Sequence, residues 1–102
     1  MGAWFYILRC ADGSYYVGST RTDLETRVAQ HQAGLFGGYT STRRPVALVY
    51  SEHFDQIVDA IAAERKVKGW SRAKKEALMA DDFTRLSKLS QRRKAFPRKT
   101  SS

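Results

Sequence analysis

The sequence of 102 residues has little that could cross-link it or hold it in a membrane. Its one cysteine, Cys10, cannot form a disulfide within the chain, and its cysteine and histidines lack the spacing of a structural zinc site. The longest apolar stretch near the N-terminus, residues 4–8, is far shorter than the ~20 residues of a membrane span, and we expect no signal peptide. We therefore expect a reduced, cytoplasmic protein.

Acidic residues are missing from one region, the C-terminal end. The chain has 18 Lys and Arg against 10 Asp and Glu, a formal net charge of +8. Residues 83–102 have no acidic side chain and carry +7, which leaves +1 for residues 1–82. The length excludes a multidomain enzyme, so we expect one nearly neutral domain over 1–82 and a basic, mobile tail over 83–102. This tail favours nucleic acid as the partner, and DNA is the nucleic acid that we expect. Nothing in the sequence indicates a membrane or protein partner.

Local patterns predict a small α+β domain. Asp12-Gly13 is a strong hairpin signal between two stretches rich in β-branched and aromatic residues. Thr22 and Glu25 have the spacing of a capping box at the start of a helix. The expected strands are 3–10, 15–20 and 46–51, and the expected helices are 23–33, 57–69 and one from 71, with a weak fourth helix over 83–89. The order ββαβαα predicts a three-stranded sheet flanked by helices.

One acidic residue interrupts the apolar stripe of the second predicted helix. At 100° per residue, Glu64 lies about 20° from Ile57 and between Ala60 and Ile61. A buried carboxylate needs a cation, a metal ion or several hydrogen-bond donors. A structural ion pair with an arginine and a catalytic role both meet this need, and position alone favours the ion pair.

Two basic side chains lie together on the first predicted helix. Arg27 and His31 are four residues apart and so share one face, beside the apolar stripe. A histidine beside an apolar stripe is more often a hydrogen-bonded packing residue than a catalytic one, and a pair with Asp23 or Glu25 would explain Arg27.

The predicted hairpin carries two tyrosines, Tyr6 and Tyr16, whose relative placement depends on the strand register. A two-residue loop that pairs Cys10 with Tyr15 puts them on opposite faces of the sheet. A three-residue loop with a bulge, pairing Cys10 with Tyr16, puts them on the same face. Strand tyrosines are usually packing residues, so the register decides whether these two can share a site.

Taken together, these residues resemble the GIY-YIG nuclease family over roughly residues 4–80. Trp4-Phe5-Tyr6 and Tyr16-Val17-Gly18 correspond to its two short motifs, and Arg27, His31 and Glu64 follow in order. The stretches 6–14, 39–45 and 71–78 are similar to a branch of small, single-domain bacterial members. The asparagine that many members carry after the metal-binding helix has no clear counterpart, since Gly69-Trp70-Ser71 stands there.

The resemblance implies a GIY-YIG endonuclease-like fold, with a three-stranded antiparallel sheet flanked by helices, and hydrolysis of nucleic-acid phosphodiesters with one divalent ion, Mg²⁺ or Mn²⁺. By position, Glu64 would hold the metal, Tyr6 would be the general base, Tyr16 would orient water or substrate, Arg27 would steady the phosphate and His31 would assist Tyr6. The substrate contacts would be Gly18, Tyr39, Arg43 and Arg44.

Two expectations qualify that function. A free tyrosine has a pKa near ~10, so nearby cations must shift the pKa of Tyr6 before it can accept a proton at neutral pH. Only the loop over residues 34–45 and the basic tail remain to read the substrate, and we therefore expect low sequence specificity. The alternative is a non-catalytic nucleic-acid-binding module that keeps the scaffold and uses its basic tail.

Overall fold

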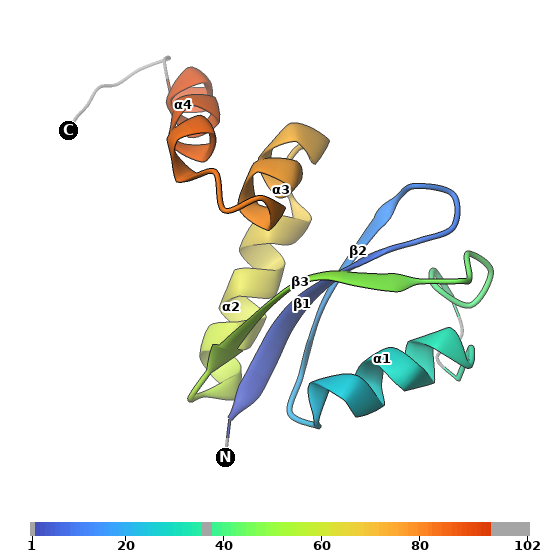
Figure 1. Cartoon of the computed structure of the whole chain (residues 1–102). Helices are drawn as coiled ribbons and strands as arrows, with labels where there is room; N and C mark the ends of the chain where they lie inside the picture. The colour runs from blue at the N-terminus through green and yellow to red at the C-terminus, as the bar shows by residue number, and fades with distance from the viewer. Residues whose placement is uncertain (1, 36–37, 95–102) are drawn as a thin grey trace. The chain divides into compact units, whose positions relative to one another are not determined.

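The computed structural model describes residues 2–35 and 38–94, with side chains as far as residue 89. Its elements are β1 (Ala3–Arg9), β2 (Tyr15–Thr20), α1 (Leu24–Gln32), β3 (Ala47–Phe54), α2 (Ile57–Lys68), α3 (Arg72–Met79) and α4 (Phe83–Lys94) (Figure 1). The predicted fold class is confirmed: the described chain forms a three-stranded antiparallel sheet with four helices.

The chain divides into two compact units, Met1–Gly69 and Trp70–Ser102. The predicted domain boundary after residue 82 stays a prediction. The weak fourth helix is present as α4 and extends to Lys94, beyond its expected end. The rest of the predicted mobile tail lies outside the described residues.

The sheet has the order β2-β1-β3, with the central strand β1 antiparallel to both neighbours. Side chains of β1 are buried on both faces, because each face is covered by a helix. On one face Tyr6 and Leu8 join a cluster that includes Leu24 and Val28 of α1. On the other face α2 packs against β1 and β2. The core of this unit therefore lies on both sides of β1.

The hairpin between β1 and β2 decides where the tyrosines point. Leu8 pairs with Tyr16, which leaves a three-residue loop over 11–13 and puts Cys10 opposite Ser14. The predicted two-residue loop is therefore wrong. The predicted three-residue loop correctly places both tyrosines on one face of the sheet, but Cys10 lies opposite Ser14 and not opposite Tyr16. Gly13 has φ 85°, a left-handed conformation that suits glycine and closes the short loop. Tyr6 and Tyr16 therefore share one face of the sheet.

Other element ends differ from expectation by a few residues. The first helix is capped by Asp23, whose carboxylate accepts from the Thr26 amide at 3.2 Å, and so begins one residue later than expected. The expected cap Thr22 instead bonds the hydroxyl of Thr20. Strand β3 continues to Phe54 because its pairing with β1 extends to Ala3.

In the second unit, α3 and α4 contact each other. Ser71 caps α3 as expected, accepting from the Lys74 amide at 3.2 Å, and Asp82 accepts from the Arg85 amide at the start of α4.

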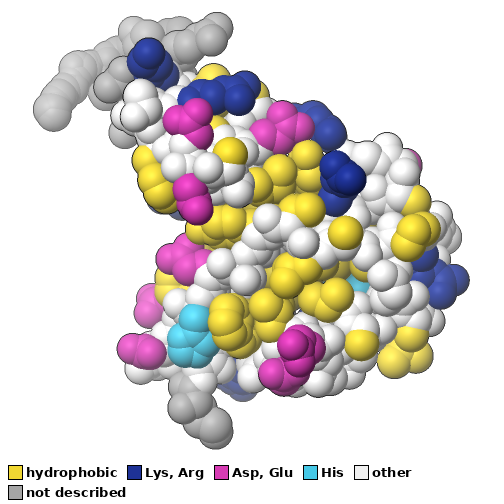
Figure 2. Space-filling model, viewed as in Figure 1, with side chains coloured by type: hydrophobic (Ala, Val, Ile, Leu, Met, Phe, Trp, Pro, Cys, Tyr) yellow, Lys and Arg dark blue, Asp and Glu magenta, His cyan; other side chains and the backbone are white. Residues whose placement is uncertain are grey.

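The described residues include no helix long and apolar enough to cross a membrane. In the view of Figure 2, charged side chains of both signs occur in small separate groups.

Candidate active site

Three rings meet on the face of the sheet that α1 covers. Tyr6 comes from β1, Tyr16 from β2 and His31 from the last turn of α1. The Tyr6 hydroxyl lies 2.9 Å from His31 Nε2, and the ring centroids of Tyr16 and His31 are 5.0 Å apart. Tyr6 and His31 are both almost fully buried, whereas Tyr16 is half-buried. The hairpin register and α1 together build this cluster.

Gly18 lies opposite Tyr6 in β2 and leaves the room that the tyrosines occupy. A Cβ atom at this position would lie 2.6 Å from the Tyr6 hydroxyl oxygen and 3.0 Å from the Tyr16 ring. Any larger residue would displace one of the two rings. Gly18 thus has a steric reason to be glycine, and its predicted role as a substrate contact stays a prediction.

Thr40 completes a chain of buried hydrogen bonds that begins at Tyr6. The His31 Nδ1 atom lies 2.9 Å from the Thr40 hydroxyl, which is also buried. Sequence reasoning cited Thr40 within a motif but gave it no role, since nothing local to residues 39–45 indicates a partner on α1. The structure therefore adds Thr40 to the site as the group that fixes the His31 ring.

The protonation states follow from burial. Burial, and to a lesser extent the charge of Arg27, lowers the pKa of His31, so the imidazole is neutral near neutral pH. Burial and the neighbouring Tyr16 raise the pKa of Tyr6. A hydrogen bond from Arg27 and the charge of Arg27 lower the Tyr6 pKa, but burial outweighs both. Arg27 alone therefore does not bring the pKa of Tyr6 below its ordinary value, and the role of Tyr6 as the general base stays a prediction.

The neutral His31 ring joins two hydroxyl groups. Its Nε2 atom shares a hydrogen bond with the Tyr6 hydroxyl and its Nδ1 atom shares one with the Thr40 hydroxyl. In a neutral imidazole one ring nitrogen donates and the other accepts, and hydroxyl groups can do either, so both tautomers satisfy both bonds. Tyr6 is thus a phenol whose oxygen is hydrogen-bonded to an imidazole nitrogen.

Glu64 approaches from the other face of the sheet. Its Oε1 atom accepts a hydrogen bond from the Ser19 hydroxyl at 2.5 Å, and its Oε2 lies 2.9 Å from Lys68 Nζ. Its negative charge contributes to the raised pKa of Tyr6, so the two groups are within electrostatic reach. The ion pair expected with a distant arginine is formed instead with Lys68, one turn along the same helix. Ser19 is a partner that the sequence did not predict.

Glu64 is a single carboxylate, and this limits how a metal ion could be held. The described residues include no group of three or more His, Cys, Asp or Glu side chains that could enclose an ion. Mg²⁺ commonly binds one or two carboxylates and completes its shell with water and substrate phosphate. The donor set around Glu64 fits this second arrangement.

Loop residues extend the ring cluster toward the surface. Tyr39 stacks on Tyr16 with centroids 6.2 Å apart, and the Arg43 guanidinium carbon lies 3.9 Å from the Tyr39 ring centroid. Arg43 Nε also donates to the Asp12 carboxylate of the hairpin loop at 3.1 Å. Arg44, in contrast, donates to backbone carbonyls of Ser41 and Gln32. Of the predicted substrate contacts, Tyr39 and Arg43 join the cluster, and Arg44 ties the loop to the end of α1.

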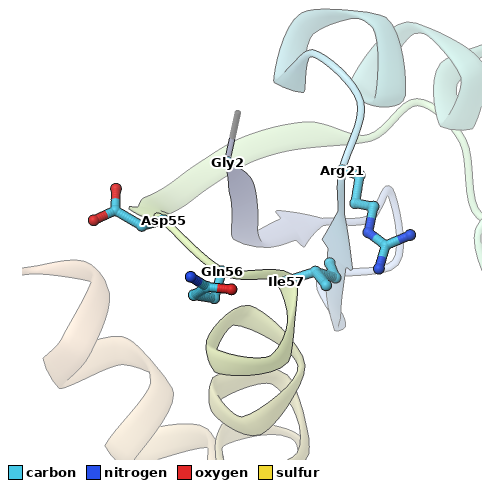
Figure 3. Close-up of a pocket in the computed structure, with 5 residues that line it drawn as sticks. All are labelled: Gly2, Arg21, Asp55, Gln56 and Ile57. Atoms are coloured by element: carbon cyan, nitrogen blue, oxygen red, sulfur yellow. The ribbon is translucent and has the colours of Figure 1, made fainter.

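A surface pocket lies away from these residues, where α2 begins and β2 and β3 end. It is lined by Gly2, Arg21, Asp55, Gln56 and Ile57 (Figure 3). None of the predicted site residues lines it. The candidate chemistry is therefore centred on the tyrosines and His31, and not on this pocket.

The fold and the site both correspond to known proteins. The model of the GIY-YIG catalytic domain matches residues 2–77. The chain therefore belongs to the GIY-YIG family, as the sequence resemblance predicted, and a GIY-YIG catalytic domain is associated with nuclease-like activity on nucleic acid and with a divalent metal ion.

Within that family, the similar chains are UPF0213 proteins of archaea and bacteria. One from Natronomonas pharaonis is 48% identical over 79 residues, which cover 78% of this chain and 92% of the relative. The solution structure of the UPF0213 protein BH0048 from Bacillus halodurans is 41% identical, with a TM-score of 0.51 over 78% of this chain and 84% of that one. That of EF2693 from E. faecalis is 32% identical, with a TM-score of 0.56 over 82% of this chain and 88% of that one. The predicted branch of small proteins thus includes archaeal members.

Proposed function

We propose that the protein is a metal-dependent endonuclease that hydrolyses phosphodiesters of nucleic acid with low sequence specificity, and that its favoured substrate is DNA. The hydrogen-bond chain from Tyr6 through His31 to Thr40 is the observation that carries this proposal. It joins a buried phenol to a neutral imidazole beside the cation Arg27, in a chain of the GIY-YIG family. Packing alone does not require two buried polar rings to be linked in this way.

Phosphodiester hydrolysis needs an attacking water that loses a proton. In the proposed reaction the Tyr6 oxygen accepts that proton while its own proton passes to His31 Nε2. Thr40 keeps the imidazole oriented, and the resulting imidazolium lies near Arg27, which favours later return of the proton. Tyr6 is therefore the direct base and His31 the group that makes it basic enough.

Arg27 and Tyr16 are proposed to position the phosphate and the water. An arginine offers a planar pair of donors that match two phosphate oxygens, and charge on those oxygens grows during the reaction. The half-buried Tyr16 lies beside His31 and leads to Tyr39 and Arg43 at the surface. We propose that these two loop residues contact the substrate.

Glu64 is proposed to hold a Mg²⁺ or Mn²⁺ ion, with the Ser19 hydroxyl fixing one carboxylate oxygen. Such an ion would neutralise charge on the phosphate and stabilise the leaving oxygen.

The test is cleavage of DNA by the full chain with Mg²⁺ or Mn²⁺. Glu64→Gln and Tyr6→Phe should each lower the rate at least a hundredfold. Glu52→Gln provides a matched control, because Glu52 is an exposed carboxylate on β3 whose hydroxyl partner is Tyr50. Circular dichroism should show the same fold for all variants. Undiminished cleavage by Glu64→Gln would contradict the metal assignment, and undiminished cleavage by Tyr6→Phe would contradict the base.

The second candidate is a nucleic-acid-binding module without catalysis, favoured by the basic sequence of residues 83–102. Replacing Arg85 and Lys88 of α4 by glutamine should weaken DNA binding and flatten its salt dependence under either function. Under the enzymatic function, cleavage at saturating DNA should persist in this variant. Absence of metal-dependent cleavage in the unmodified chain, together with salt-dependent binding, would favour the second candidate.

A further inference from the structure

The carboxylate of Glu64 has both oxygens engaged before any divalent ion arrives. Ser19 donates to Oε1, and the Lys68 ammonium lies 2.9 Å from Oε2. Since Ser19 is neutral, Lys68 is the group that balances the charge of Glu64. A cation that binds this carboxylate must therefore compete with an ammonium that already occupies its outer oxygen.

Exposure indicates which partner can leave. The Lys68 side chain is 59% exposed and that of Glu64 only 20%. Glu64 is held by Ser19 from the sheet side, whereas Lys68 reaches it along the outer surface of α2 on a flexible stem. Lys68 can thus swing into water without moving the helix, and Glu64 stays in place.

We propose that Lys68 holds the cation position on Glu64 in the free protein, and that a divalent ion binds there by displacing the Lys68 ammonium. Lys68 then acts as a positioning residue that keeps Glu64 ready while it lowers the affinity for metal in the absence of substrate. This inference rests on the proposed function, since it assumes that Glu64 is the metal ligand.

Local charge supports this competition. Among the described residues Glu64 is not part of a cluster of three or more metal-ligating side chains, so an incoming ion meets one negative charge that Lys68 already balances. Arg27 adds a further positive charge near Tyr6. A substrate phosphate brings the negative charge that Glu64 lacks, which favours metal binding together with nucleic acid rather than before it.

Removing the ammonium should therefore strengthen metal binding. Lys68→Met keeps an unbranched side chain of similar length and a good helix former but removes the charge. From Coulomb's law at a few ångströms in a largely aqueous setting, we expect roughly a five- to tenfold tighter affinity. Lys68→Arg, which keeps the charge, should bind metal no more tightly than the unmodified protein.

The experiment measures Mn²⁺ binding to the full chain without nucleic acid, from the loss of the electron paramagnetic resonance signal of free Mn²⁺. Lys66→Met is the matched control, because it removes the same charge from the same helix about 200° away from Glu64. We expect tighter binding only in Lys68→Met and no such binding once Glu64→Gln is added. Circular dichroism checks that each variant keeps its helices.

The outcomes separate this inference from the proposed function. Equal or weaker Mn²⁺ affinity in Lys68→Met, including no measurable binding, would overturn the competition. An equal gain in Lys66→Met would also overturn it, since the effect would then be one of net charge. Binding that is unchanged by Glu64→Gln would remove Glu64 as the ligand, and DNA cleavage in the same samples judges the enzymatic function separately.

Discussion

Replacement of Gly18 by alanine tests the steric basis of the site. The added Cβ atom would lie 2.6 Å from the Tyr6 hydroxyl oxygen and 2.7 Å from its Cζ, about 1 Å closer than ordinary van der Waals contact allows. Tyr6 is buried and bonded to His31, so it cannot simply swing into solvent. Overpacking of this kind costs about 1–3 kcal/mol, of which a better strand propensity returns roughly 0.5–1 kcal/mol. We expect a net loss of about 1–2 kcal/mol.

The assay is urea unfolding followed by circular dichroism, combined with the NMR titration of the His31 ring. Gly18→Ala should lower the free energy of unfolding and change the His31 titration, because Tyr6 moves away from Nε2. Gly13→Ala is the control: its Cβ would have no neighbour within 4 Å, but a φ of 85° strains alanine by about 1 kcal/mol or more. It should destabilise the protein and leave His31 unchanged. A Gly18→Ala protein with full stability and an unchanged His31 titration would refute the steric argument.

Two further predictions concern the hydrogen-bond chain. Folding lowers the pKa of His31 below its ordinary 6.5, so as the pH decreases the unfolded chain protonates this imidazole before the folded chain does. The free energy of unfolding should therefore fall as the pH decreases below about 6.5. In urea unfolding, His31→Gln should lack this part of the pH dependence. Thr40→Val should destabilise the fold by about 1–3 kcal/mol, because it leaves His31 Nδ1 without its buried hydrogen-bond partner. Thr40→Ser should recover most of this loss in thermal unfolding, and equal stabilities of the two variants would contradict the bond.

The order of elements could be predicted because each has a local signal. Asp12-Gly13 marks the hairpin, and Ser71 caps α3 at the predicted position. Candidate residues also fall on the predicted elements, since Arg27 and His31 lie on α1 and Glu64 on α2. Sequence spacing is enough for this level of description.

Partners and protonation states could not be predicted because they depend on contacts between distant segments. Thr40 meets His31 only after the loop folds back on α1, and nothing near residue 40 indicates that contact. Burial outweighs the cation Arg27 and raises the pKa of Tyr6, and sequence spacing does not reveal this balance. The ion pair of Glu64 was also predicted with the wrong partner. The sequence suggested an arginine from another segment, but Lys68, four residues away on the same helix, forms the pair.

Edge strand β2 connects the two halves of the candidate site through two adjacent residues. Gly18 faces Tyr6 and leaves room for the tyrosines, and Ser19 points to the other face and bonds Glu64. A shift of one residue in the hairpin register would exchange these two faces, so that both interactions would be lost together. The three-residue loop closed by Gly13 is therefore required for the side-chain arrangement on both faces, although it lies at the far end of the hairpin from Ser19.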